Sequence, residues 1–112
     1  MQKKNIVWFC ADQLRWDTIS GYGNEHIRTP NIDRLMREGT TFLRANSQSP
    51  VCTPSRASFL TGRYPKSARA SINGNKIFSR DETLVTRLLR DNGYVCGLTG
   101  KLHLTSSSAR DH

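Results

Sequence analysis

The chain has 112 residues, enough for one small domain, and 36% of them are hydrophobic. The hydrophobic residues are grouped into periodic segments, which argues for a folded domain and against disorder, and no apolar run approaches the roughly 20 residues of a membrane span. Lysine and arginine number 17 against 9 acidic residues, a net charge of +8, but the basic residues are scattered. Such a balance suits either nucleic acid or an anionic small substrate; because the basic residues are scattered, we expect no nucleic acid as a partner, and no membrane.

The first residues bear on where the protein resides. Two lysines precede an apolar run, as in a signal peptide, but the run extends only from Ile6 to Ala11 and ends at Asp12. It is too short for the hydrophobic part of a signal peptide. Taking Met1 as the native start, we expect a cytoplasmic protein.

Three segments are expected to be strands. Residues 5–11, NIVWFCA, are short, continuously apolar and rich in aromatic and branched side chains, which predicts a buried strand. Residues 40–46 and 94–100 are interpreted in the same way.

Three helices are expected between these strands. Residues 29–39 begin with a threonine N-cap and a proline at the first helical position, and they end at a glycine. Further helices are expected at about 54–60 and at 81–93, and each stops near a glycine. Residues 64–81 look irregular, with an Asn-Gly turn at 73–74.

The order strand, helix, strand, helix, helix, strand predicts an α/β fold with a mostly parallel sheet flanked by helices. Ligands bind at the carboxyl ends of the strands in such sheets. The polar residues that follow the three strands are Asp12 and Gln13, the loop around Cys52, and Lys101 with His103. We expect them to meet at one edge of the sheet, with the last two on the same side of an extended segment.

The three cysteines differ in their surroundings. An odd number without a CxxC pair argues against a disulfide framework. Cys10 and Cys96 lie in apolar runs, where buried packing explains them. Cys52 instead precedes Pro54, the expected first residue of a helix, and a helix N-terminus favours an anion. Arg56 adds a positive fork suited to sulfate or phosphate oxygens.

The segment CTPSRASFLTGR, Cys52–Arg63, resembles the signature of the type I sulfatases in the alkaline-phosphatase-like superfamily. The stretches ADQ, TPNIDRLMREGTTFLRAN and GKLHL resemble flanking motifs of that family, in the right order. The resemblance covers residues 5 to about 104. It implies that residues 1–105 are the N-terminal part of an alkaline-phosphatase-like catalytic domain, followed by a polar tail at 106–112.

The resemblance also implies a modified residue. In the family the signature cysteine becomes formylglycine, so a formylglycine-generating or equivalent enzyme is expected to act on Cys52. Hydrated, the aldehyde carries two hydroxyls on one carbon. One attacks the sulfur of a sulfate ester, and the other then expels sulfate. The implied function is that of a sulfuric ester hydrolase, a sulfatase, whose substrate is a sulfated small molecule or sugar.

Four further residues receive catalytic or binding roles by resemblance. Arg56 serves the finished formylglycine, Lys101 contacts the sulfate and the formylglycine, and His103 orients or deprotonates the second hydroxyl. Asn73 lies where some relatives hold a sulfate oxygen, although it is equally well explained by the Asn-Gly turn. A solvated surface side chain is the alternative for Lys101 and His103, and Arg63 is expected to be a structural part of the signature.

By resemblance, Asp12, Gln13 and the modified Cys52 bind a divalent metal. Calcium is expected, with manganese as the alternative, and a turn or capping residue is the other interpretation of Asp12. Gln13 departs from the commoner pair of successive aspartates, although calcium accepts amide oxygens. An Asp-Gln pair also resembles phosphonate monoester hydrolases, so a phosphonate or phosphate monoester hydrolase of the same superfamily is an alternative.

The family's second pair of metal ligands, with a further lysine and histidine, lies far downstream of the signature. No residue after His103 supplies them, so we expect the chain to be an N-terminal portion that is inactive alone and able to self-associate. The other alternative is a non-catalytic basic binding module that has kept the motif.

Overall fold

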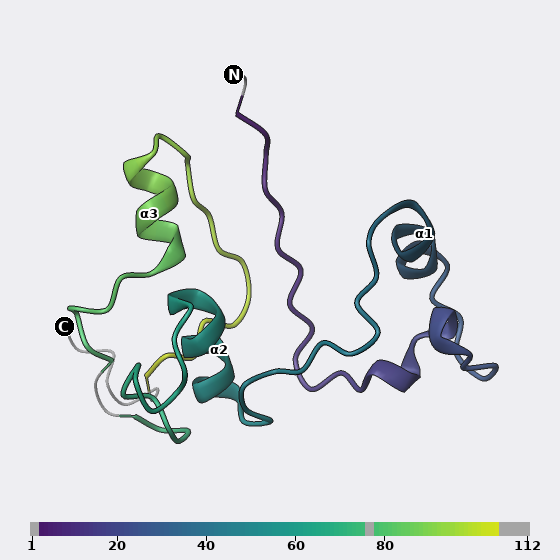
Figure 1. Ribbon diagram of the computed structural model, residues 1–112, viewed down its shortest axis with the longest axis horizontal. Helices are drawn as coiled ribbons and strands as arrows, with labels where there is room; N and C mark the ends of the chain where they lie inside the picture. Colours follow the sequence, from purple (N-terminus) through teal and green to yellow (C-terminus); the bar gives the residue numbers. More distant parts are fainter. Residues whose placement is uncertain (1–2, 76–77, 106–112) are drawn as a thin grey trace. The chain divides into compact units, whose positions relative to one another are not determined.

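The structure, a computed structural model, describes residues 3–75 and 78–105. It divides into two compact units, Met1–Ala45 and Asn46–His112, whose helices are labelled in Figure 1. The predicted polar tail at 106–112 lies outside the described residues. Among the helices of the described residues, none is both long enough and apolar enough to cross a membrane.

In its described residues, the N-terminal unit contains one α-helix, α1 (Pro30–Glu38). Two short 3₁₀ turns precede it, η1 (Trp16–Thr18) and η2 (Ser20–Tyr22). The structure confirms the predicted helix. Pro30 has the backbone angle of the first helical position, and Gly39 is the C-cap. Thr29 is the N-cap as predicted, but its side chain makes no capping hydrogen bond to the backbone.

Asp33, in the first turn of α1, joins this helix to η2. Its carboxylate accepts hydrogen bonds from Ser20 Oγ at 2.6 Å, the Gly21 backbone N–H at 2.8 Å and Thr29 Oγ1 at 2.9 Å. The hydrogen bond from Ser20 is the main reason that the pKa of Asp33 is lowered, since it stabilises the ionised form. These bonds fix the turn against the start of the helix.

The described part of the C-terminal unit contains two helices, α2 (Cys52–Thr61) and α3 (Val85–Asp91), which contact one another. Figure 1 draws α2 in teal and α3 in green. A small group of buried apolar side chains forms the core of this unit: Ala57, Ala68, Ala70 and Leu104. The partly buried side chains packed against it are those of Leu60, Phe78 and Leu84. The core therefore joins α2 to the residues just before α3 and just after Lys101.

The prediction of a helix over 81–93 is too long at its N-terminal end. The helix starts only after Leu84, which is its N-cap, and its first turn holds no acidic residue. Glu82 lies outside the helix and instead forms an ion pair with Arg63. The predicted stop is confirmed, since Gly93 adopts a left-handed conformation with φ of 78° just beyond the C-cap.

The predicted strands are not formed in the described part of the chain. Residues 5–11 and 94–100 have no regular structure, and 40–46 contain a turn. A strand needs a hydrogen-bonded neighbour, and no described segment pairs with these three. Their apolar side chains remain exposed, among them Phe9 at 91% and Val95 in full. The sheet of the predicted α/β architecture is therefore not confirmed.

Candidate active site

Cys52 is the first residue of α2, so the helix starts two residues earlier than predicted. Val51, in an extended conformation, is the N-cap. Pro54 occupies the third helical position, where a missing N–H removes no helical hydrogen bond. At the other end Gly62 is left-handed, with φ of 68°, and its N–H donates to the Ser58 carbonyl oxygen at 2.8 Å. The helix thus holds Cys52 on its first turn.

Several signature residues just after Cys52 face the interior. Thr53 and Pro54 are fully buried, and Arg56 is only 7% exposed. Cys52 itself is only partly buried and forms no disulfide. The packing of its neighbours therefore fixes the backbone of Cys52, while its side chain keeps access to the surface.

The structure brings Lys101 to Cys52 from 49 residues away in the sequence. Lys101 Nζ donates to Cys52 Sγ at 3.4 Å. The Arg56 guanidinium, which leaves the same helix on its buried side, donates through Nη1 to the backbone carbonyl oxygen of Lys101. Arg56 thus holds the backbone of Lys101, while the lysine side chain extends to the sulfur. This arrangement places a cation beside a potential nucleophile.

The side chain of Asn73 contacts the backbone of the same helix turn. Its Oδ1 accepts a hydrogen bond from the Thr53 N–H at 2.9 Å, and it begins the predicted turn, in which Gly74 has φ of 81°. The Thr53 N–H is therefore occupied, and Pro54 has none. The start of α2 therefore offers fewer N–H groups to an anion than expected, and the Lys101 ammonium is a cation that contacts residue 52.

His103 lies half-buried two residues beyond Lys101. Its backbone is left-handed, with φ of 52°, so the segment is not evenly extended. The argument that alternation puts both side chains on one side is therefore wrong for this segment. The buried ring atom Nδ1 has no hydrogen-bond partner among the described residues. A buried ring nitrogen of this kind is a group that a ligand or further protein can satisfy.

The expected metal ligands Asp12 and Gln13 belong to the N-terminal unit. They form a turn after the extended residues 5–11, and Gln13 is left-handed with φ of 54°. Both side chains are exposed and carry oxygen donors, which is the chemistry that a hard cation such as calcium prefers. Within 3–75 and 78–105, no group of three or more His, Cys, Asp or Glu side chains could hold a metal ion.

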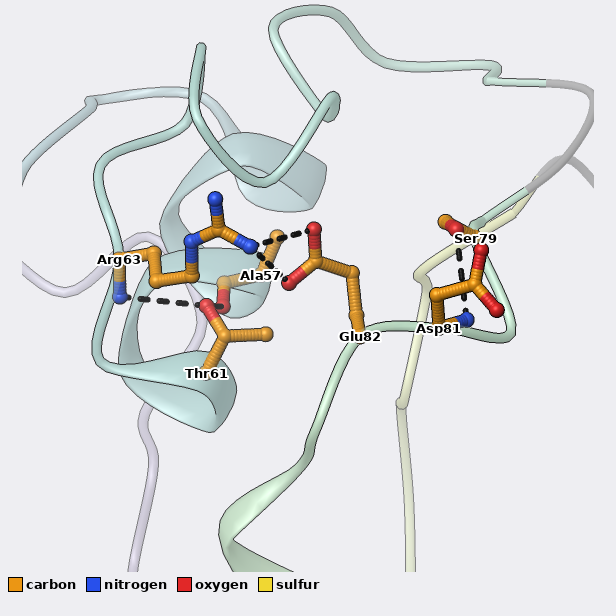
Figure 2. Close-up of polar contacts among 6 residues, drawn as sticks. All are labelled: Ala57, Thr61, Arg63, Ser79, Asp81 and Glu82. Carbon is orange, nitrogen blue, oxygen red and sulfur yellow. Dashed lines mark hydrogen bonds and ion pairs between the residues drawn. The ribbon is translucent and has the colours of Figure 1, made fainter.

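One structural contact near the site was not predicted. Arg63, the last signature residue, lies 2.8 Å from Glu82 Oε2 and 2.9 Å from Oε1 through Nη1 (Figure 2). Glu82 lies at the start of the segment predicted to be the helix over 81–93, where an acidic residue is typical of a first turn. No sequence signal identifies its true partner, because acidic residues before a helix are common.

These contacts define the class of site: a side chain on the first turn of a helix, a facing ammonium group and a buried arginine that holds them together. Comparison with known proteins gives the family. The family model described as Sulfatase matches residues 4–111. This chain belongs to the sulfatase family, as its motifs predicted.

Curated relatives agree with this assignment. Human steryl-sulfatase is 43% identical over 115 residues, which cover 94% of this chain and 20% of that protein. Arylsulfatase H of Canis lupus familiaris is 42% identical over 123 residues, 98% of this chain and 22% of the relative. An N-acetylgalactosamine-6-O-sulfatase of Bacteroides thetaiotaomicron is 39% identical over 107 residues, 92% and 21% respectively. The chain thus spans only 20% to 22% of these relatives' length, and no solved structure matches it.

Proposed function

We propose that the whole protein hydrolyses sulfate esters, with a formylglycine made from Cys52 as nucleophile and a divalent metal ion as cofactor. The observation that carries the proposal is the 3.4 Å contact between Lys101 Nζ and Cys52 Sγ, in a chain of the sulfatase family. Sγ here stands in for the oxygen that the mature residue carries on the same carbon. When hydrated, the modified residue would supply two hydroxyls. The metal, when bound, would supply positive charge.

The residues of this chain have separate tasks. Lys101 offers its ammonium to the oxygen of residue 52 and to the sulfate, where negative charge develops during reaction. Arg56 fixes the backbone of Lys101, and a buried charge-assisted hydrogen bond suits that task. Asn73 holds the first turn of α2 with Oδ1, which leaves its amide Nδ2 for a sulfate oxygen. His103 orients or deprotonates a hydroxyl of residue 52, and its unpaired buried Nδ1 supports this role.

The proposed metal is calcium, with manganese as the alternative, held by Asp12, Gln13 and the modified Cys52. A carboxylate and an amide oxygen on consecutive residues fit the donor chemistry of a hard cation. Calcium takes about six to eight oxygen ligands, so further ligands must come from the rest of the whole protein.

We also propose that residues 5–11, 40–46 and 94–100 are strands of a mostly parallel, alkaline-phosphatase-like sheet in the whole protein. Their exposed apolar side chains support this, because large exposed apolar surfaces in a soluble domain call for a covering element. Asp12 and Gln13 would then follow the first strand.

The substrate class follows from the family. The relatives are named as a steryl-sulfatase and an N-acetylgalactosamine-6-O-sulfatase, and we propose a sulfated small molecule or sugar for this protein. Gln13 in place of an aspartate favours a second candidate, a phosphonate or phosphate monoester hydrolase, because the site loses one negative charge.

Modification of Cys52 is tested by peptide mass spectrometry of protein made in a host that has the modifying enzyme. Conversion removes about 18 Da from the cysteine peptide, or about nothing when the aldehyde is hydrated, and an aldehyde-reactive probe separates these cases. Cys10 and Cys96 are internal controls, which should keep free thiols. Absence of probe labelling at Cys52 in a competent host contradicts the proposal.

Turnover is tested with an aryl sulfate and an aryl phosphonate monoester, with calcium or manganese added. The full-length protein should hydrolyse the sulfate faster, and Cys52→Ala should abolish the reaction. Cys52→Ser keeps one hydroxyl but lacks the second, so it should stall as a sulfated enzyme after one turnover. Faster hydrolysis of the phosphonate identifies the second candidate, and steady turnover by the serine variant contradicts the two-hydroxyl mechanism.

A further inference from the structure

The end of α2 fixes the backbone of Arg63 and so the direction of its side chain. Thr61 Oγ1 donates to the Ala57 carbonyl oxygen at 2.6 Å and accepts a hydrogen bond from the Arg63 backbone N–H at 3.2 Å (Figure 2). Gly62 between them is left-handed, so the chain reverses immediately after the helix. As Figure 2 shows, the Arg63 guanidinium then extends toward the carboxylate of Glu82.

The carboxylate that Arg63 meets is nearly buried. The side chain of Glu82 is 7% exposed, whereas that of Arg63 is 53% exposed. A carboxylate shielded from water needs its cation, because an unpaired buried charge is strongly unfavourable. The pair therefore differs from an exposed surface ion pair such as Arg87–Asp91, which contributes little.

Glu82 stands at the start of the segment that leads to the active site. Two residues later Leu84 packs against the core and caps α3. The chain then continues from α3 to Lys101, which returns to α2 at Arg56 and Cys52. The segment 82–101 is thus fastened to α2 at both of its ends, by the ion pair near the end of the helix and by Lys101 near its start.

We propose that Arg63 and Glu82 are positioning residues, whose ion pair fixes where Lys101 Nζ lies opposite residue 52. Neither side chain is assigned a contact with substrate, and both act through the segment between Glu82 and Lys101. The proposal rests on the proposed function, in which Lys101 serves the sulfate and the formylglycine. It gives Arg63, the last residue of the signature, a task in catalysis beyond stabilising the fold.

The principal test is Glu82→Gln in the full-length protein, which keeps the side-chain shape and removes its charge. We expect kcat for an aryl sulfate to fall about tenfold, since a small displacement of a catalytic group has effects of this order. In protein made without the modifying enzyme, Lys101 should be acylated faster than in the wild type, relative to Lys66, because its ammonium leaves Cys52. Mass spectrometry of the labelled peptides measures both lysines.

Two further variants separate positioning from general stability. Asp91→Asn removes the exposed pair with Arg87 on α3 and should change neither readout. The charge exchange Arg63→Glu with Glu82→Arg should restore most of the lost turnover and the slow labelling of Lys101.

Unchanged kcat and unchanged labelling in Glu82→Gln overturn the positioning role. Recovery of thermal stability in the charge exchange without recovery of Lys101 labelling shows a purely structural pair and overturns it as well. If the wild type hydrolyses no sulfate ester but Glu82→Gln still accelerates Lys101 labelling, the proposed function fails and the positioning role stands.

Discussion

Asn73 Oδ1 accepts the hydrogen bond of the Thr53 backbone N–H at 2.9 Å, which joins an Asn-Gly turn to the first turn of the helix that carries Cys52. The bond resembles a helix cap supplied from a distant part of the chain. It satisfies a donor that the helix itself cannot satisfy. Residue 52 therefore depends on a turn about 20 residues away for the order of its backbone, since the two bonded residues are that far apart.

Substitution of Asn73 distinguishes its two roles. Asn73→Ala should lower the free energy of unfolding by about 0.5–2 kcal/mol, the usual effect of losing a cap. Asn73→Asp keeps the accepting oxygen and should stay near wild-type stability, but its negative charge should repel sulfate and abolish turnover. Urea unfolding and aryl sulfate hydrolysis measure the two effects. Full activity in Asn73→Asp would show that the residue only caps the helix.

Arg56 is expected to tolerate no replacement, even by lysine. Arg56→Lys keeps the charge but loses the guanidinium that donates to the Lys101 carbonyl oxygen. Loss of such a charge-assisted bond should cost about 1.5–3 kcal/mol of stability, and Lys101 should no longer be held at Cys52. Thermal unfolding and kcat measure the change. An exposed arginine on α3, Arg90, replaced by lysine is the control, and equal behaviour of both variants contradicts the role of Arg56.

The pH dependence of the N-terminal unit should depend on Ser20. The lowered pKa of Asp33 contributes stability that is present above the pKa of an unfolded aspartate and is lost as pH falls through the lower folded pKa. Ser20→Ala removes the main cause, so the pKa of Asp33 should rise. The variant should be less stable than the wild type at neutral pH, and the difference should shrink in acid to what the lost acceptor of the Thr29 N–H leaves. Carboxyl NMR titration and unfolding at several pH values test this. A stability difference of the same size at every pH would show that Ser20 acts without the ionised carboxylate.

Gly62 should resist replacement because of its backbone conformation. Its φ of 68° is left-handed, and Gly62→Ala should cost about 1–2 kcal/mol of stability. Gly97→Ala is a matched control, since a Cβ there would meet no atom within 4 Å and its φ is not left-handed. Thermal unfolding compares the two variants. Equal stability would mean that the end of α2 can adjust without glycine.

Local signals predicted the helices well. Pro30 and Gly39 mark the two ends of α1 through their own backbone preferences, and Gly62 and Gly93 mark the ends of the other two helices in the same way. The family signature was also readable, because its residue types and spacing lie within one short segment. Such signals depend on neighbours in the sequence and survive without knowledge of the fold.

Contacts between distant segments were harder to predict from the sequence. In the sequence, Glu82 has the place of an acidic residue in the first turn of a helix. Only the folded chain shows that its partner is Arg63. The left-handed backbone of His103 defeated an argument from alternation, since a single reversal of φ changes the direction of every later side chain. The approach of Lys101 to Cys52 followed from the expected sheet, although the described residues form no strand.

The buried side of the signature constrains the order of events during biosynthesis. Thr53 and Pro54 are fully inaccessible, and Arg56 nearly so, once α2 packs on its core. An enzyme that recognises these side chains cannot reach them without unwinding the helix. If Cys52 is converted as proposed, the conversion would therefore have to precede the packing of α2. In a cell where folding is faster than modification, the protein would accumulate with its thiol intact and could not be rescued later.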